Sequence, residues 1–521
     1  HQIIYLLRLL EAWEHHEPGA IGTWLEIPVF VYADVPYVLA DHDAMIRDPR
    51  NTITFDKRRA DAIVQREARL GSDGRLVVDA DGALLRVGLL EKLLVPALAK
   101  LTSYVPGGGI WLNTQRPEWN DANNALAGPG LSMVTLYHLR RYLRFVSSQL
   151  DGVDADSVGF TSSVAVWVGD ILDVFEQIPP ATEPIDDRAR RSIVDALGAA
   201  GSAHRRRVGE GTENTSLDVS IADLRHLCEL AGEHMEQSIR DAQRADGLYH
   251  SYNRVSFPTG DTAHVDHLGP MLEGQVAVLS SGALDPEDSI DLIDALFSSG
   301  MYRADQNTFM LYPVVALPPF LERNIVPPEA VAATPWLAGS ADDSLRRILT
   351  TDPDGRLRFR PDIINTGVLA TLLDQTTLSE SVRDWVTELY EQVFHHHSFT
   401  GRSGSMYGYE GIGSVYWHMV AKLLLAVQET YWSAVDQGAP DDVTGRLAEA
   451  YRRIRSGFGF RQQPAEFGAI PTDCYSHTPA HAGAQQPGMT GQVKEEVLTR
   501  FGELGLRVTK GHVSLHPGLL P

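Results

Sequence analysis

Residues 128–145 read GPGLSMVTLYHLRRYLRF, so a break marked by glycine and proline leads directly into an apolar run. Apolar side chains in this run recur at three- and four-residue spacing: Met133, Leu136, Tyr137, Leu139, Leu143 and Phe145. Such spacing predicts a helix with one buried face, and the break predicts the turn that starts it. The same plan, a polar loop followed by an apolar helix, returns at 267–281 and at 401–431.

The recurrence of this plan predicts the fold class. Loops that stand at one end of a set of inner helices line a cup, as in a toroid of helical hairpins. We therefore expect an all-α dominated chain, an (α/α)6 toroid with minor β segments, and an ordinary helical array of the solenoid kind is the alternative. Further helices are predicted at 89–101, 187–200, 218–245, 286–299, 379–395 and 441–455, and short strands at 27–32, 76–78, 506–508 and 512–515.

Three segments are expected along the chain. Residues 1–84 are predicted to be the N-terminal part of the barrel or a linker region, truncated upstream. Residues 85–460 are predicted to form the catalytic barrel, and residues 461–521 a loop that covers the active site followed by a helix and strand segment. The chain opens on His1 rather than Met, which we interpret as a piece of a longer polypeptide.

Composition and charge exclude several classes of function. The chain of 521 residues is 43% hydrophobic, enough for a large core, and its 45 basic and 68 acidic residues give a net charge of -23. This field repels nucleic acid and anionic membranes but does not penalise a neutral sugar. No apolar run is long enough to span a bilayer, and the two cysteines, Cys228 and Cys474, cannot build a disulfide framework. A reducing, cytoplasmic setting is the expectation.

The segment with the most chemistry is Arg116-Pro117-Glu118-Trp119-Asn120-Asp121-Ala122-Asn123-Asn124. Glycosidic cleavage needs a carboxylic acid that protonates the departing oxygen, and an indole can stack on the sugar beside it. Asp121 is the candidate acid. The candidate substrate contacts around it are Arg116, Glu118, Trp119, Asn120 and Asn124. The alternative is a polar loop whose Asp and Asn only cap the following helix.

This segment resembles the Asp-Trp-Asn-Asp-Gly-Met-Asn motif of the cellobiose and chitobiose phosphorylase family of glycoside hydrolases (family 94-type). The resemblance implies that Asp121 is the general acid of an inverting enzyme, flanked by Trp119 and Asn120. Further likenesses follow in the family's order: residues 130–136 match its Gly-Glu-Ser-Val-Trp-Leu helix, and residues 272–282 match its Ala-Gln-Ser-Trp-Ala-Val-Leu-Ser-Gly segment. Together they cover roughly residues 85–430. The substrate implied is a β-linked gluco-oligosaccharide.

A glycine-rich stretch at 400–414, TGRSGSMYGYEGIGS, is similar to the loop that helps bind phosphate in relatives acting on β-1,2-glucans. Inorganic phosphate would be a co-substrate, and no cofactor is expected. The candidate phosphate contacts are Arg402, Ser403, Ser405, Gly413 and Ser414. One departure weakens this expectation, because residues 360–369, matched to the family's Glu-Asn-Gly-Gly-x-Tyr-x-His-Ala segment, contain no histidine.

Glu410 in the same loop supports an alternative. An inverting hydrolase needs a second carboxylate, about 6.5–9.5 Å from the acid, to activate water. Glu410 is the candidate base for such an enzyme, with Asp121 as its acid. A glycan-binding or scaffold protein without catalysis is the third reading. The family resemblance favours the phosphorylase.

Two other regions offer candidate sugar contacts. They are the loop at 246–253 and the start of the helix at 271, with the candidates Tyr249, His250, Asn253, Glu273 and Gln275. A helix-ending turn and core polar pairs are the plain alternatives. Histidines cluster at 15–16, 395–397 and 477–481, but adjacent histidines on a helix point in different directions, so no metal is expected. The predicted partners are an oligosaccharide, a second copy in a homodimer, and an N-terminal portion of the same polypeptide that the resemblance implies.

Overall fold

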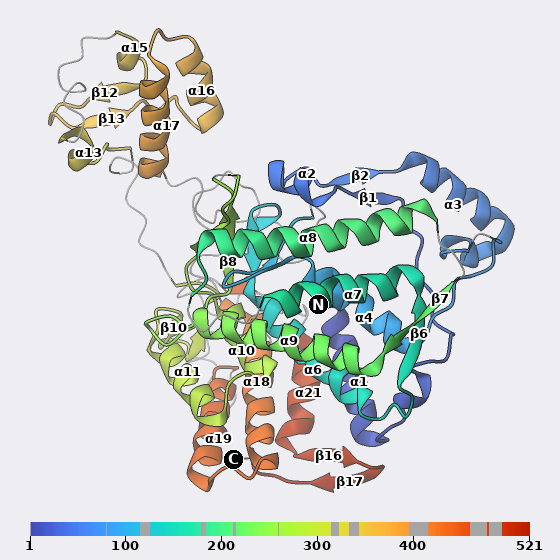
Figure 1. The fold of residues 1–521 in the computed structure, drawn as a ribbon. Helices are drawn as coiled ribbons and strands as arrows, with labels where there is room; N and C mark the ends of the chain where they lie inside the picture. Colours follow the sequence, from blue (N-terminus) through green and yellow to red (C-terminus); the bar gives the residue numbers. More distant parts are fainter. Residues whose placement is uncertain are drawn as a thin grey trace. The chain divides into compact units, whose positions relative to one another are not determined.

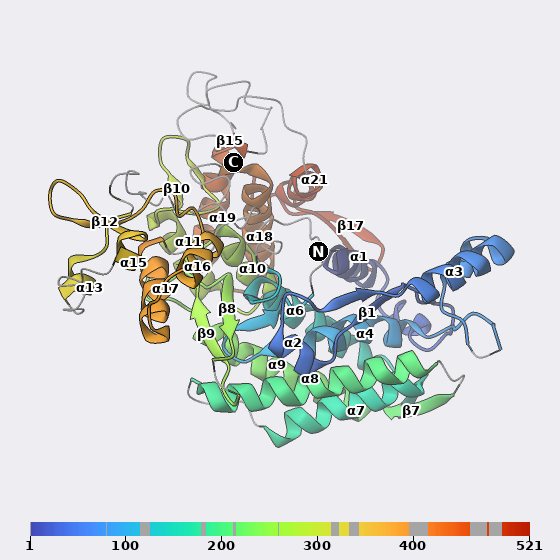
Figure 2. The ribbon, with the colours of Figure 1, turned by 90° about the horizontal axis from the view of Figure 1, so that it is seen from above.

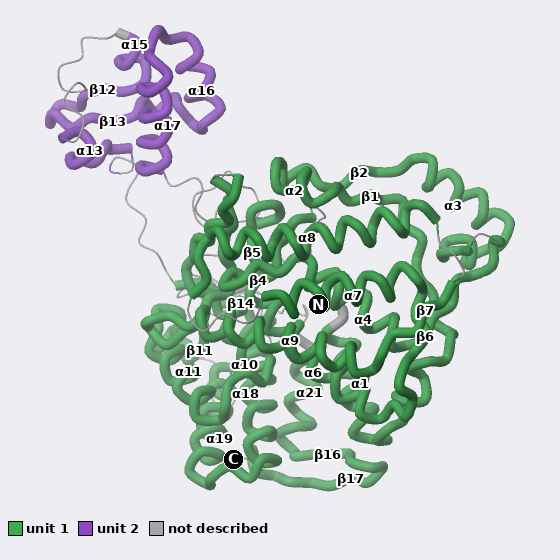
Figure 3. Tube along the Cα trace, in the orientation of Figure 1, with its two compact units in different colours: residues 1–313, 413–521 green, residues 314–412 purple. Residues whose placement is uncertain are grey.

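A computed structural model describes residues 2–79, 81–114, 126–178, 184–211, 215–258, 260–313, 322, 324–332, 343–394, 415–458, 477–478 and 492–520. The chain forms two compact units (Figure 3). Unit 1 comprises residues 1–313 and 413–521, and unit 2 comprises residues 314–412. Unit 2 therefore interrupts the sequence of unit 1, inside the segment that was expected to be one barrel.

Three helices form the centre of unit 1: α6 (Met133–Leu150), α10 (Leu272–Ser281) and α18 (Trp417–Asp436). α10 packs between the other two (Figure 1), and every one of its residues is buried. Near its C-terminal end, the carbonyls of Ser280 and Ser281 accept hydrogen bonds from Arg141 and Arg140 of α6. Arg141 also pairs with Glu429 in the later part of α18. The three helices therefore run in the same direction.

Further helices surround this centre (Figures 1 and 2). α9 packs on α6 and α7, α4 packs on α6 and α7, and α11, α19 and α21 pack on α18. Their bounds are α1 Gln2–His16, α2 His42–Arg47, α3 Lys57–Leu70, α4 Leu89–Leu101, α7 Ser162–Gln177, α8 Asp187–Glu210, α9 Ile221–Asp241, α11 Pro286–Ser298, α19 Asp441–Ser456 and α21 Gln492–Glu503. None of the helices in the described ranges has the length and apolar character needed to cross a bilayer.

Unit 1 also contains an antiparallel five-stranded sheet in the order β3-β4-β5-β8-β9, whose strands lie between α4 and α6 and between α9 and α10 along the chain. Its strands are β3 Tyr104–Val105, β4 Gly109–Trp111, β5 Gly130–Ser132, β8 Tyr252–Ser256 and β9 His264–His267. Two-stranded pairs complete unit 1: β1 Tyr37–Leu39 with β2 Ile53–Phe55, β6 Ser157–Thr161 with β7 Ser216–Ser220, β10 Tyr302–Arg303 with β11 Thr308–Phe309, β14 Val415–Tyr416 with β15 His477–Thr478, and β16 Leu506–Thr509 with β17 His512–Leu515.

Unit 2 has a core of its own. Its elements are α13 Pro328–Ala332, α15 Asp343–Arg346, β12 Leu349–Thr351, β13 Leu357–Phe359, α16 Thr366–Asp374 and α17 Glu380–Phe394. Phe359 is fully buried and its ring meets those of Tyr390 and Phe394 of α17. Arg358 pairs with Asp352 across the β12–β13 hairpin, at 2.7 Å.

The fold is helix-dominated, as the sequence predicts, and the hairpin expected at 506–515 is present. A complete (α/α)6 toroid stays a prediction. The strands expected at 27–32 and 76–78 are wrong, because these residues make only isolated bridges, such as Phe30 with Val87. The helix expected from 218 begins at Ile221, since the residues before it pair as β7 with β6.

A charge network ties three helices together around Arg141. Its guanidinium donates to both carboxylate oxygens of Glu11 on α1, at 2.9 and 2.6 Å, and to Glu429, which also binds Arg8. Burial opposes the charge of Arg141, but Glu429 and Glu11 outweigh it and raise its pKa. Burial likewise opposes ionisation of Glu429, and Arg8 and Arg141 outweigh it and lower its pKa. Arg141 and Glu429 thus both remain charged in this network.

Replacing Arg141 by methionine should lower the free energy of unfolding by about 1.5–3 kcal/mol, because two partly buried carboxylates lose charge-assisted hydrogen bonds. Urea denaturation measures the change. Lys57→Met is the matched control, since Lys57 and Asp61 form an exposed pair with side chains 78% and 60% accessible. That control should cost less than about 1 kcal/mol. Similar losses in both variants would contradict the role of the network.

Candidate functional site

Three segments with candidate residues lead into the N-terminal ends of α6, α10 and α18. Two of them lie outside the described residues. The first holds Arg116, Glu118, Trp119, Asn120, Asp121 and Asn124, and the second holds Arg402, Ser403, Ser405, Glu410, Gly413 and Ser414. The roles predicted for these residues stay predictions. The residues that flank the two segments are described, and so are the candidate residues of the third segment.

Both ends of the segment that holds Asp121 are attached to the five-stranded sheet. Leu112 donates its N–H to the carbonyl of Gly130 at 2.8 Å, and Gly128 donates to the carbonyl of Leu112 at 2.7 Å. The Trp111 indole donates to the Gly128 carbonyl at 2.6 Å. Gly128 has φ of +103°, and a Cβ there would lie 2.8 Å from the Arg50 side chain, so this anchor requires glycine. The loop thus begins and ends beside β4 and β5, at the entrance to α6.

The backbone N–H groups at the start of α6 find hydrogen-bond acceptors within the protein. Ser132 caps the helix by accepting the N–H of Thr135 at 3.0 Å. The N–H groups of Met133 and Val134 donate to the carbonyl of Ser251, the residue before β8. These amides are therefore already engaged, and the end of α6 serves as a rigid support for the loop before it.

Gln275 of α10 acts as a clamp on the loop before β8. Its side chain is fully buried, and its Oε1 accepts the N–H of Tyr249 at 2.8 Å. Both hydrogens of its Nε2 are used, one on the carbonyl of Tyr249 at 2.8 Å and one on that of Met271 at 2.9 Å. Burial and these bonds disfavour a direct sugar contact, which stays a prediction for this residue. We assign Gln275 a positioning role.

Asn253 and Glu273 are also tied into the frame. Asn253, 1% exposed, donates to the carbonyl of Gly108 at 2.8 Å, and its Oδ1 faces Nδ1 of His267 at 2.9 Å. Glu273, 4% exposed, accepts the hydroxyl of Tyr252 at 2.8 Å. Burial, followed by the charge of Glu273, raises the pKa of Tyr252, so the phenol stays the donor of this bond. Tyr252 was not predicted as a site residue, because the sequence of its strand, YNRVS, does not show that its hydroxyl bonds Glu273.

His250 lies closest to a ligand-binding geometry among the described candidates. Its ring stacks on that of His267, with centroids 4.2 Å apart. Its Nδ1 is buried and has no hydrogen-bond partner among the described residues. Burial, and then the neighbouring His267, lower its pKa to about 4, so His250 is neutral near pH 7. Tyr249 beside it is buried, and burial together with Asp288 raises the pKa of its hydroxyl to about 12.

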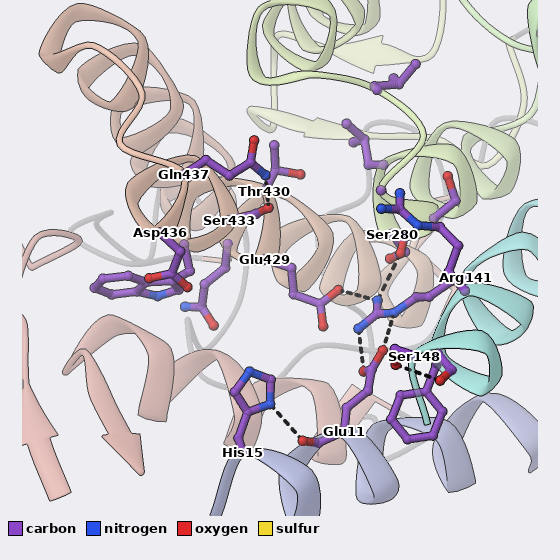
Figure 4. Close-up of a pocket in the computed structure, with 18 of the residues that line it drawn as sticks. Glu11, His15, Arg141, Ser148, Ser280, Glu429, Thr430, Ser433, Asp436 and Gln437 are labelled. Carbon is purple, nitrogen blue, oxygen red and sulfur yellow. Dashed lines mark hydrogen bonds and ion pairs between the residues drawn. The ribbon is translucent and has the colours of Figure 1, made fainter. Parts of the chain in front are cut away.

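A separate cleft of about 710 Å³ lies toward the opposite end of the central helices (Figure 4). It is lined by Glu11, Arg141, Ser280, Glu429 and Asp436, among others, and by none of the candidate residues. Arg141 forms ion pairs with Glu11 and Glu429, and Arg507 forms one with Asp436. Three of the carboxylates in this cleft are therefore paired with arginine.

The described residues bring together no group of three or more His, Cys, Asp or Glu that could hold a metal ion. His15 and His16 end α1, where His15 bonds the backbone carbonyl of Glu11. The triplet at 395–397 lies outside the described residues.

Residues 317–397 match a family model described as GH149 phosphorylase insertion domain 2. The matched range falls within unit 2, which is compact and inserted into unit 1. A search of curated proteins finds no match to the chain. The match supports an enzyme of the glycoside phosphorylase type, and it supports at a coarse level the resemblance to phosphorylases noted in the sequence.

The same match corrects one step of the sequence analysis. Residues 360–369 were paired with a histidine-containing segment of the phosphorylase barrel. They lie instead in unit 2 and within the matched insertion domain, where they end one turn and begin α16. The absence of a histidine at this place is therefore no argument against phosphate.

Gln275→Met should lower the free energy of unfolding by at least about 2 kcal/mol, because it leaves the N–H and carbonyl of Tyr249 buried without partners. Gln437→Met at the C-cap of α18 is the matched control, since Gln437 is exposed and its amide donates to the hydroxyl of Ser433, which is also exposed. It should change stability by less than about 0.5 kcal/mol. Equal midpoints of urea unfolding for the two variants would refute the clamp.

The lowered pKa of His250 makes stability depend on pH. In the unfolded chain this histidine titrates near 6.5, and in the folded chain near 4, so protons bind the unfolded state preferentially. Stability should be complete above about pH 6.5 and fall by on the order of 1–3 kcal/mol toward pH 4 through this group. In His250→Gln the slope of unfolding free energy against pH should be shallower. An unchanged slope would show that His250 does not stay neutral in the folded state.

Proposed function

We propose that this protein is an inverting glycoside phosphorylase that cleaves β-glucosidic bonds of gluco-oligosaccharides. The observation that carries the proposal is the match of residues 317–397 to a phosphorylase insertion domain, which coincides with a separate compact unit. The ordered likenesses around Asp121 and at 400–414 support it.

In this proposal Asp121 protonates the departing glycosidic oxygen while inorganic phosphate attacks the opposite face of the sugar. Trp119 stacks on the sugar, and Arg116, Glu118, Asn120 and Asn124 bond its hydroxyls. Tyr249 and His250 lie at the end of unit 1 where α6 and α10 begin. The attachment of residues 112 and 128 to the sheet supports the role of Asp121, because a proton donor must be held within hydrogen-bond reach of its target.

Phosphate binding is assigned to Arg402, Ser403, Ser405, Gly413 and Ser414. Their segment leads into β14 and α18, and the dipole of a helix N-terminus favours an anion. Tyr416, at the N-cap of α18, makes no side-chain capping hydrogen bond.

Hydrolysis with Glu410 as base is the second candidate, and it differs in the attacking group alone. Its favouring observation is the carboxylate of Glu410 within the 400–414 stretch. We further propose a cytoplasmic location, since a sugar phosphate is useful inside a cell, and a homodimer as the assembly.

Sugar release from a panel of β-linked glucans, with and without inorganic phosphate, tests the proposal. A phosphorylase yields sugar 1-phosphate only when phosphate is present. Free sugar at equal rates in both conditions would make the protein a hydrolase and would turn attention to Glu410→Gln.

Asp121→Asn should lower turnover by roughly a thousandfold or more, because the amide cannot donate the proton. Binding of the oligosaccharide, measured by calorimetry, should stay within a few-fold of the parent. Asn123→Ala, two residues away, is the control and should keep most activity. Full turnover in Asp121→Asn would overturn the assignment of the acid.

A further inference from the structure

Strand β9 adds a histidine to the predicted sugar contacts at the end of unit 1 where α6 and α10 begin. His267 is the direct cross-strand partner of Asn253 in the β8–β9 register, and residues 268–271 lead from it to α10. Its ring stacks on that of His250, with centroids 4.2 Å apart. His267 therefore contacts two residues that the sequence predicts as sugar contacts, although it was not predicted itself.

Of these three side chains, only that of His267 is well exposed to solvent. Asn253 is 1% exposed and His250 is 9% exposed, whereas His267 belongs to the exposed residues of β9. The amide of Asn253 is already used at both ends, by the carbonyl of Gly108 and by His267. The ring of His267 also covers one face of the ring of His250. A sugar that approaches this cluster from solvent therefore meets His267 before the other two.

The hydrogen bonds of Asn253 determine which nitrogen of His267 carries the proton. Nδ2 of Asn253 donates to the carbonyl of Gly108 at 2.8 Å, so Oδ1 of the same amide faces Nδ1 of His267, at 2.9 Å. An amide oxygen only accepts hydrogen bonds, and Nδ1 must therefore be the donor. Partial burial, followed by the charge of Arg190, lowers the pKa of His267, so its ring is neutral near pH 7. Nε2 is then left with a lone pair.

A neutral imidazole with one fixed acceptor nitrogen suits a hydroxyl group. A sugar hydroxyl can donate a hydrogen bond, and Nε2 of His267 can accept one. The bond to Asn253 and the stack on His250 hold the imidazole in place, so it loses little freedom when a hydroxyl binds. A phosphate oxygen is itself an acceptor and gains nothing from this nitrogen.

We infer that His267 is a specificity residue of the proposed enzyme, whose Nε2 accepts a hydrogen bond from a hydroxyl of the gluco-oligosaccharide. Asn253 is the positioning residue that fixes its tautomer. The inference rests on the proposed function. It assigns the direct sugar contact to the exposed histidine rather than to Asn253 and His250.

Two substitutions separate sugar recognition from a structural tie between β8 and β9. Asparagine can place an N–H donor near the position of Nδ1 but leaves no acceptor near that of Nε2, where glutamine can place its amide oxygen. His267→Asn should raise the KM for the oligosaccharide about two- to tenfold, the loss of one neutral hydrogen bond. His267→Gln should restore most of the loss. A structural tie alone predicts an unchanged KM in His267→Asn, which keeps the bond to Asn253.

His264→Gln is the matched control. His264 is the other histidine of β9 and is also exposed. It lies three residues before His267, so its side chain points to the opposite face of the strand. The KM for the oligosaccharide should stay at the value of the parent. A rise equal to that in His267→Asn would contradict a specific contact at His267.

Calorimetry with the same oligosaccharide in phosphate-free buffer measures binding without depending on turnover. The parent and His267→Gln should bind more tightly than His267→Asn. Equal affinities of the parent and His267→Asn would overturn the inference and leave the proposed function intact. A parent that binds the oligosaccharide but releases no product would overturn the proposed function, while the order of affinities would still decide the role of His267. A parent that neither binds nor cleaves any glucan of the panel would overturn both.

Discussion

Helix α10 is buried along its whole length, so every polar group it carries must find a partner inside the protein. Gln275 and Glu273 meet the loop and strand at 249–252, and Arg140 and Arg141 of α6 cap the carbonyls at its other end. These bonds hold α6, β8 and α10 in one register. The remaining architecture of unit 1, including the direction of the central helices, depends on that register.

The two ends of the central helices therefore differ in the roles of their polar residues. At the C-terminal end, Arg141 neutralises Glu11 and Glu429, and the charges there serve packing. At the N-terminal end, short strands anchor the loops that lead into the helices, and Nδ1 of His250 is left without a described partner.

The sequence predicted the central helices, whose apolar residues recur at helical spacing. The helices at 133, 272 and 417 were expected within a few residues of where they begin, because their apolar spacing is strong. The five-stranded sheet was not expected, since strands as short as Tyr104–Val105 leave no periodic pattern. Unit 2 was not separated from the barrel, because its core residues, such as Phe359 and Tyr390, follow the same periodicities as those of unit 1.

The sequence likewise predicted only part of the candidate site. Residue chemistry singled out Tyr249, Asn253, Glu273 and Gln275, and the structure brings them to one end of unit 1. The sequence alone could not distinguish a residue that contacts a ligand from one that positions its neighbours. That distinction depends on which side-chain atoms already make hydrogen bonds within the protein.

The most direct test of the account is the anomeric form of the first product, followed by proton NMR as a β-linked gluco-oligosaccharide is cleaved in phosphate. Displacement from the opposite face of the sugar turns a β-bond into an α-configured product. An inverting phosphorylase gives α-glucose 1-phosphate as that product. Free glucose without a sugar phosphate, or a β-configured sugar phosphate, would contradict the proposed mechanism.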